Sequence, residues 1–222
     1  MHTDSVSAAR VAGPAADFAR GGQLARPASL RLRRGIAQIV MHEDGAAIGG
    51  LAVCWGGGSY LSAPLEGATR PVRDVVTPPG SRRETRRHTR AETVVVATGQ
   101  SVPLVEGAAG VALDVFGPQD TVEVQRLLAP NGLFLVVVPT VAHLAELLRP
   151  LAVLRVTRRR PSRPVAAVGR FRRGITRVVS YQVDLDRADV ADLVDVDVED
   201  LRSVPEQTTV TISARISSYR AR

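Results

Sequence analysis

The stretch VALDVFGPQDTVEVQRLLAPNGLFLVVVP, residues 111–139, decides the fold of this chain of 222 residues. Two apolar runs in it, residues 111–116 and 133–138, have the length and composition of buried strands. Residues 120–128 between them predict a helix, which the turn residues Pro130, Asn131 and Gly132 end. A strand, a helix and a second strand in this order are the unit of a mostly parallel sheet. The stretch therefore predicts an α/β fold.

The flanking segments extend this sheet. Toward the N-terminus, short apolar runs predict strands at residues 46–54, 72–76 and 93–97. Toward the C-terminus, residues 175–183 and 208–219 are longer β-type stretches. In the second of these, apolar and polar side chains alternate as in a half-buried strand, which is typical of an antiparallel sheet edge.

Three further helices are predicted. They lie at residues 5–20, 141–148 and 187–194. The second is expected to end before Pro150, and the third to be opened by Asp184 or Asp186, because a carboxylate in front of a helix accepts hydrogen bonds from its first amides.

The composition is that of a globular protein with a basic surface. Hydrophobic residues make up 45% of the chain and charged residues 23%, and the formal net charge is +7. All 29 basic residues are Arg. Arg presents a planar set of donors that suits phosphate, which favours a nucleic-acid partner. Arg without Lys also arises from a GC-rich gene, so this alternative stays open.

The cysteine count and the N-terminus bear on the compartment. The single cysteine, Cys54, excludes an internal disulfide framework and a zinc site built from several thiolates of this chain. Residues 1–20 lack the apolar region of a signal peptide, and no run reaches the roughly 20 apolar residues that cross a bilayer. We expect a cytoplasmic protein.

One span of the chain carries positive charge alone. Residues 147–183 contain no Asp or Glu. The arginines proposed to bind RNA in this span are Arg155, Arg158, Arg159, Arg160, Arg163, Arg170, Arg172 and Arg173. Exposed arginines at this density are expected to contact RNA phosphates and to make binding salt-dependent. The alternative is a solvated linker in a protein rich in Arg.

Two segments carry a family resemblance: QSVPLVEGAAGVALDVFGP, residues 100–118, and RLLAPNGLFLVVVPTVAHLAEL, residues 126–147. With these motifs the chain resembles the 23S rRNA (guanine-N1)-methyltransferases, most closely the branch that confers tylosin and mycinamicin resistance. The resemblance implies a class I S-adenosylmethionine-dependent methyltransferase, a Rossmann-like α/β fold with a seven-stranded sheet whose last strands are antiparallel. Residues 1–45 are then an N-terminal helical linker segment and residues 46–222 the methyltransferase domain.

The resemblance also implies a reaction. The protein is expected to transfer a methyl group from S-adenosylmethionine to N1 of a guanine in a 23S rRNA hairpin, which gives resistance to macrolides. The family's zinc ribbon has no counterpart in this sequence, so no zinc is expected in this chain. Guanine N1 must lose a proton to become nucleophilic. No residue is assigned as the catalytic base.

The family motifs assign candidate site residues. Those for the cofactor are Leu24, Gly56, Gly57, Gly58, Asp74 and His143, and those for the acceptor pocket are Asp114 and Phe116. A Gly-rich turn lets the backbone approach the cofactor closely, and an acidic side chain after the next strand binds its ribose. Structural alternatives stay open for some of these residues: the glycines as an ordinary turn, His143 as a capping or core hydrogen-bonding group, and Asp114 as a strand-end carboxylate.

Departures from the family pattern leave other functions open. Ala52 and Cys54 stand in the cofactor loop where the family has Asp and Gly, and Ala97 replaces an acidic residue. A catalytically degenerate relative that binds RNA would show such changes. A shifted reading frame over residues 31–90 is another explanation of the weak match there. A small-molecule methyltransferase of the same fold is the third alternative.

Overall fold

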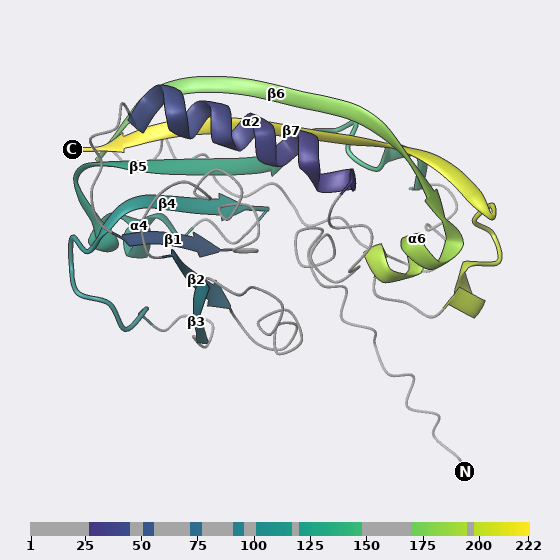
Figure 1. Ribbon diagram of the computed structural model, residues 1–222, viewed down its shortest axis with the longest axis horizontal. Coiled ribbons are helices and arrows are strands. Elements are labelled where there is room, and N and C mark those ends of the chain that lie inside the picture. Colours follow the sequence, from purple (N-terminus) through teal and green to yellow (C-terminus); the bar gives the residue numbers. More distant parts are fainter. Residues whose placement is uncertain are drawn as a thin grey trace, which may run out of the picture.

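The computed structural model describes residues 27–44, 51–55, 72–76, 91–95, 101–116, 120–147, 170–194 and 198–222. These residues form one sheet of seven strands in the order β3-β2-β1-β4-β5-β7-β6 (Figure 1). The strands are β1 Leu51–Trp55, β2 Val72–Val76, β3 Ala91–Val95, β4 Ala109–Val115, β5 Leu128–Pro139, β6 Phe171–Asp186 and β7 Gln207–Ala221. The helices are α2 Pro27–Asp44, α4 Thr121–Leu127 and α6 Arg187–Val194, with single 3₁₀ turns at η2 Ala145–Leu147 and η5 Val198–Leu201.

Strand direction changes at one place in this sheet. The neighbours from β3 to β5 pair in parallel, whereas β7 is antiparallel to both β5 and β6. The sheet is therefore the α/β sheet predicted from the sequence, with antiparallel pairing at its last strands. The long strands β7 and β6 form one end of the strand order, and α2 lies alongside them (Figure 1).

Helix α2 covers one face of the sheet. Its buried side chains Leu32, Ile36, Ile39 and Val40 recur at helical spacing and belong to the larger of two core clusters. A Cβ at Gly35 would lie 2.7 Å from a methyl group of Val179 in β6, so glycine allows the helix to approach the strand this closely. The predictions from the sequence missed α2. The predicted domain boundary between residues 45 and 46 stays a prediction. Helix α2 precedes this boundary but packs on the sheet of the domain that follows it.

The C-terminal end of α2 is anchored at a bulge in β6. The β6–β7 register shifts between Arg173 and Thr176. There the amide of Ile175 donates to the hydroxyl of Ser218 at 2.7 Å, and that hydroxyl donates to Glu43 Oε1 at 2.7 Å. Burial acts to raise the pKa of Glu43, but the hydrogen bonds from Ser218 and Ile175 and the nearby Arg220 charge outweigh it and lower the pKa.

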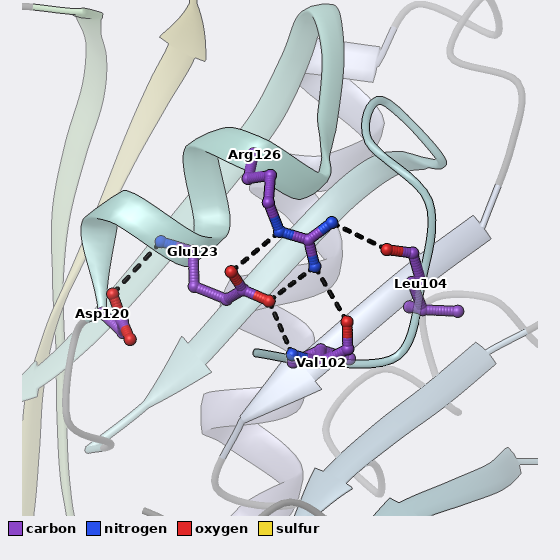
Figure 2. A network of polar contacts seen from close by, with 5 residues as sticks. All are labelled: Val102, Leu104, Asp120, Glu123 and Arg126. Carbon is purple, nitrogen blue, oxygen red and sulfur yellow. Dashed lines mark hydrogen bonds and ion pairs between the residues drawn. The ribbon is translucent and has the colours of Figure 1, made fainter. Parts of the chain in front are cut away.

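A polar network fastens α4 to the segment before β4 (Figure 2). The helix begins after Asp120, whose side chain accepts from the Glu123 amide at 3.1 Å. Glu123 in turn accepts from the amide of Val102 at 2.6 Å and from Arg126 at 2.7 and 2.9 Å. Arg126 also donates to the carbonyls of Val102 and Leu104 at 2.8 and 2.7 Å. The network thus joins both chain segments that flank β4.

Most elements agree with the sequence predictions. Strand β2 coincides with residues 72–76, and the helix predicted at 187–194 is α6. Asp186 opens α6, because its carboxylate accepts from the Asp189 amide at 2.7 Å, whereas Asp184 accepts from the Thr209 hydroxyl. Strand β3 lies two residues before the predicted 93–97, and β6 and β7 extend beyond their predicted ends.

The helix predicted at residues 141–148 is wrong. The described part of this segment forms turns and the short η2. Leu144 has a φ of +53°, outside the helical region, and its amide donates to the carbonyl of Thr211 in β7 at 2.7 Å. Contacts with β7 therefore replace the hydrogen bonds of a helix. The helix predicted at 5–20 lies outside the described residues.

Among the described residues, no helix is both long and apolar enough to cross a membrane.

Candidate active site

The carboxyl ends of the parallel strands meet at one edge of the sheet. Trp55, the last residue of β1, is level with Asp114 near the end of β4, and Asp114 is level with Val136 near the end of β5. In open α/β sheets, ligands bind in the crevice outside these carboxyl ends. This edge is therefore the candidate active site.

Asp114 is almost fully buried at this edge, at 1% exposure. Residues that are level on neighbouring parallel strands share a face of the sheet, so its carboxylate lies on the face of Trp55 and Val136. A carboxylate is expensive to bury, and a buried carboxylate near the carboxyl end of a parallel strand is a candidate functional group.

Phe116 turns out of β4 in an unusual backbone conformation. Its φ is +54°, which a bulky side chain seldom adopts, while its amide still donates to the Val137 carbonyl at 2.9 Å. In a regular strand consecutive side chains alternate between faces, but Val115 and Phe116 belong to the same core cluster. The turn thus brings the Phe116 ring beside the His143 ring, with centroids 5.2 Å apart. Residues held in such sparsely populated conformations cluster at ligand sites.

His143 is held against β7 by its ring. It is buried at 6% exposure, and the amide of Ser213 donates to its Nδ1 at 3.2 Å. Because a backbone amide always donates, Nδ1 carries a lone pair and the ring proton resides on Nε2. This bond agrees with the structural alternative predicted from the sequence, a core hydrogen-bonding histidine.

The sequence analysis missed the polar groups around His143. The Thr140 hydroxyl donates to the Ser213 hydroxyl at 2.7 Å. Glu146 accepts from both the amide and the hydroxyl of Thr211, at 3.0 and 2.5 Å. Thr140 and Glu146 lie inside the motif PTVAHLAEL quoted above, so the signal was present. Thr211 and Ser213 belong to the polar positions of the alternating β7 stretch.

The electrostatics of Glu146 follow from these bonds. Burial acts to raise the pKa of Glu146, but the hydrogen bonds from the Thr211 hydroxyl and amide stabilise the charged form and lower the pKa below its ordinary value. At neutral pH the carboxylate is therefore charged and accepts both bonds.

The remaining cofactor candidates are placed only in part. Asp74 is the third of the five residues of β2 and is level with Cys54 in β1. It lies within the strand, two residues before its end. Leu24 and the three glycines, Gly56–Gly58, lie outside the described residues. Because β1 ends at Trp55, the glycines follow directly after the carboxyl end of this strand.

Three of the proposed RNA-binding arginines lie in the described part of the chain. Arg170, Arg172 and Arg173 are exposed at the start of β6, and Arg173 donates to the hydroxyl of Thr176 at 3.1 Å. On the neighbouring α2, Arg31 and Arg34 are exposed as well. The other five arginines, Arg155, Arg158, Arg159, Arg160 and Arg163, lie outside the described residues.

A shallow cavity of about 220 Å³ lies away from these groups. Its lining includes Leu128 at the start of β5 and Ala221 at the end of the antiparallel β7, so it opens at the amino edge of the sheet. Since ligands of such sheets bind at the opposite edge, we do not assign this cavity to the active site.

Solved structures share this fold. A methyltransferase of Bacillus halodurans has a TM-score of 0.52 at 13% identity, over 83% of this chain and 97% of its own. A sarcosine dimethylglycine methyltransferase of Galdieria sulphuraria has a TM-score of 0.52 at 12% identity, over 88% of this chain and 87% of its own. These similarities confirm the predicted class I methyltransferase fold.

Curated relatives show the family. An inferred 23S rRNA (guanine-N1)-methyltransferase of Micromonospora griseorubida is 30% identical over 99% of this chain and 75% of its own length. The 23S rRNA (guanine(748)-N1)-methyltransferase of Streptomyces fradiae is 46% identical over 78 residues, which are 35% of this chain and 28% of that protein. No family model matches the chain. On the strength of these relatives, the chain belongs to the 23S rRNA (guanine-N1)-methyltransferase family.

Proposed function

We propose that this protein transfers a methyl group from S-adenosylmethionine to N1 of a guanine in a hairpin of 23S rRNA, and thereby makes the ribosome resistant to a macrolide. The observation that carries the proposal is the 30% identity with the Micromonospora griseorubida relative over 99% of the chain. The site geometry supports it, because Asp114, Phe116 and His143 lie at the sheet edge where class I enzymes bind their ligands.

The groups at this edge suit the cofactor chemically. S-adenosylmethionine supplies an electrophilic methyl group on a cationic sulfonium. The His143 ring, which packs beside Phe116, offers an aromatic face to an adenine or a cation, and β2, the parallel neighbour of β1, carries the acidic residue Asp74. In the proposal, Gly56–Gly58 approach the cofactor, Asp74 and His143 bind it, and Leu24 lines the site.

The acceptor pocket is proposed at the end of β4, where Asp114 lies on the face of Trp55 and Phe116 belongs to the core cluster of the opposite face. Methyl transfer depends mainly on holding the reacting atoms in line, so the rigid setting of these residues is the relevant property. Asp114 is fixed within β4, and Phe116 is fixed by the bond from its amide to Val137. The target guanine must leave its stack for its Watson–Crick edge to reach such a pocket.

The RNA partner is proposed to bind the arginines that precede and begin β6. Arg170, Arg172 and Arg173 are exposed there. Their positive charge suits RNA phosphates, and the relative from Micromonospora griseorubida is named as an rRNA methyltransferase. Phosphate contacts of this kind position an RNA without reading its sequence. We also propose that the protein is cytoplasmic, because its proposed rRNA substrate is found there.

Calorimetry with S-adenosylmethionine tests the cofactor assignment. We expect micromolar binding by the wild-type protein and none by Gly58→Asp, because a carboxylate at the glycine turn would fill the space that the cofactor needs. Met41→Asp is the control for an added carboxylate and should bind like the wild type, since the Met41 side chain is exposed on α2. A folded wild-type protein that gives no heat would instead support the RNA-binding relative without catalysis.

A transfer assay separates the two methyltransferase alternatives. We expect methyl transfer from S-adenosylmethionine to a 23S rRNA hairpin that contains the target guanine. A hairpin with the guanine replaced by adenine is the control and should accept no methyl group. Cofactor binding without transfer to any 23S rRNA fragment would contradict the rRNA assignment and favour a small-molecule substrate.

A further inference from the structure

The pairing of β5 with β7 does not stop where β5 ends. The last pair in the register is Pro139 with Ala214. Beyond it, the amides of Thr140 and Leu144 donate to the carbonyls of Ser213 and Thr211, at 3.0 and 2.7 Å. The backbone amides of the loop after β5 thus donate to two further carbonyls of β7.

Side chains of the same loop accept from the amides of the same two β7 residues. The amide of Ser213 donates to Nδ1 of His143 at 3.2 Å, and the amide of Thr211 donates to Oε2 of Glu146 at 3.0 Å. The second oxygen of Glu146, Oε1, accepts from the Thr211 hydroxyl at 2.5 Å. His143 and Glu146 therefore occupy the places that strand carbonyls would have in a continued ladder.

This arrangement holds a strained segment in place. Leu144, between the two side chains, has a φ of +53°. A left-handed conformation in a branched residue is unfavourable and persists only when its surroundings hold it. Two residues after Leu144, Glu146 binds Thr211 and fixes the end of the segment 140–147 on β7. Directly before Leu144, the ring of His143 packs beside the ring of Phe116.

We propose that Glu146 is a positioning residue: by binding the amide and hydroxyl of Thr211 it fixes residues 140–147 on β7 and thereby sets His143 beside Phe116 at the cofactor end of the site. The inference rests on the proposed function for its enzymatic readout. Glu146 acts through His143 and does not itself touch the substrates. Its removal therefore changes the affinity for the cofactor more than the affinity for RNA.

The test measures the steady-state kinetics of the full chain with S-adenosylmethionine and the 23S rRNA hairpin. In Glu146→Ala we expect the KM for S-adenosylmethionine to rise about tenfold, because a displaced His143 loses a ring contact with the cofactor of the size that aromatic contacts contribute. The KM for the hairpin should stay within about twofold. Thr211→Val, which loses the hydroxyl but keeps the amide, should give a smaller increase of the same kind, and Thr211→Ser should match the wild type.

Glu199→Gln is the control for the loss of a carboxylate, because Glu199 is exposed on η5. A merely structural role of Glu146 would reduce the active fraction, and hence kcat, with both KM values unchanged. That pattern, or wild-type kinetics in Glu146→Ala, would overturn the inference. If the wild-type protein transfers no methyl group to any hairpin, the proposed function itself is refuted, and the positioning role with it. An active wild type with an unaffected Glu146→Ala variant refutes the positioning role alone.

Discussion

The backbone amide of Ser213 donates a hydrogen bond to Nδ1 of His143 at 3.2 Å, across 70 residues of sequence. The bond fixes the ring proton on Nε2 and turns one side of the imidazole away from any ligand. His143 therefore has two separable parts: a structural nitrogen toward β7, and the remainder of the ring, which lies 5.2 Å from Phe116 between centroids.

Two substitutions at His143 are expected to separate these parts. In His143→Asn the amide oxygen can take the place of Nδ1 and accept from Ser213, so the melting temperature should stay close to that of the wild type. The affinity for S-adenosylmethionine should still fall about tenfold because the imidazole is gone. In His143→Ala both properties should be lost, with about 2 kcal/mol of stability. Thermal unfolding and calorimetry measure the two effects. Full cofactor affinity in His143→Asn would refute the binding role.

The network in Figure 2 predicts a stability that depends on pH. The hydrogen bonds from Arg126 lower the pKa of Glu123 below its ordinary value of 4.5, although burial opposes them. A carboxylate whose pKa is lower in the folded state stabilises the fold above the unfolded pKa, and this contribution disappears as the pH falls through the folded pKa. Glu123→Gln should cost about 2 kcal/mol at neutral pH.

The pH profile identifies the cause of this loss. Between about pH 5 and pH 3, the free energy of unfolding of the wild type should fall more steeply than that of Glu123→Gln. Glu199→Gln, the exposed control, should follow the wild type. Parallel curves for Glu123→Gln and the wild type would show that the Glu123 charge does not stabilise the network.

Gly174 is expected to tolerate no side chain. A Cβ there would lie 2.5 Å from the Ser218 hydroxyl and 2.6 Å from Glu43 Oε1. Gly174→Ala should therefore break the contact between α2 and the β6 bulge and lower the free energy of unfolding by about 2 kcal/mol. In the double variant Gly174→Ala/Glu43→Ala the two losses should be clearly less than additive, because both remove the same contact. Additive losses in chemical denaturation would contradict this account.

The exposed arginines of β6 predict a change in the salt dependence of RNA binding. Each phosphate contact contributes about 0.7 to 0.9 to the slope of log K against log salt. The double variant Arg172→Ala/Arg173→Ala should therefore reduce the slope by about 1 to 2. Arg202→Ala, on an exposed position after η5, should leave it unchanged. Filter binding of the hairpin over a series of salt concentrations measures the slope. Identical slopes for the double variant and the wild type would show that these arginines of β6 do not contact the RNA.

Local sequence signals predicted β1, β4 and β5 because nearly all of β1 and β4 and the second half of β5 are buried on both faces. Runs such as residues 111–116 and 133–138 contain almost no polar side chains, and an apolar run of this length between turn residues indicates a buried strand. Helix α2 was missed because Gly35 and three arginines interrupt its narrow apolar stripe. That glycine is needed for the close approach to Val179, a tertiary contact that no local pattern reveals.

The candidate site was predicted by its motif and corrected by its tertiary contacts. The motif around His143 predicts a position after a buried strand, and in the structure this residue follows the carboxyl end of β5; its binding role stays a prediction. The same residues suggested a helix, since Ala142, Leu144 and Leu147 have helical spacing and good helix propensity. Bonds to Thr211 and Ser213, more than 60 positions away in the sequence, override that preference. Local propensity cannot anticipate a partner strand at this distance.

Primer extension on 23S rRNA tests the central claim most directly, because a methyl group on guanine N1 blocks Watson–Crick pairing and stops reverse transcriptase. RNA is compared from cells that carry the gene, cells that lack it, and cells that carry Gly58→Asp. The account predicts a stop at one hairpin guanine in the first sample alone. The same pattern in all three samples would contradict it.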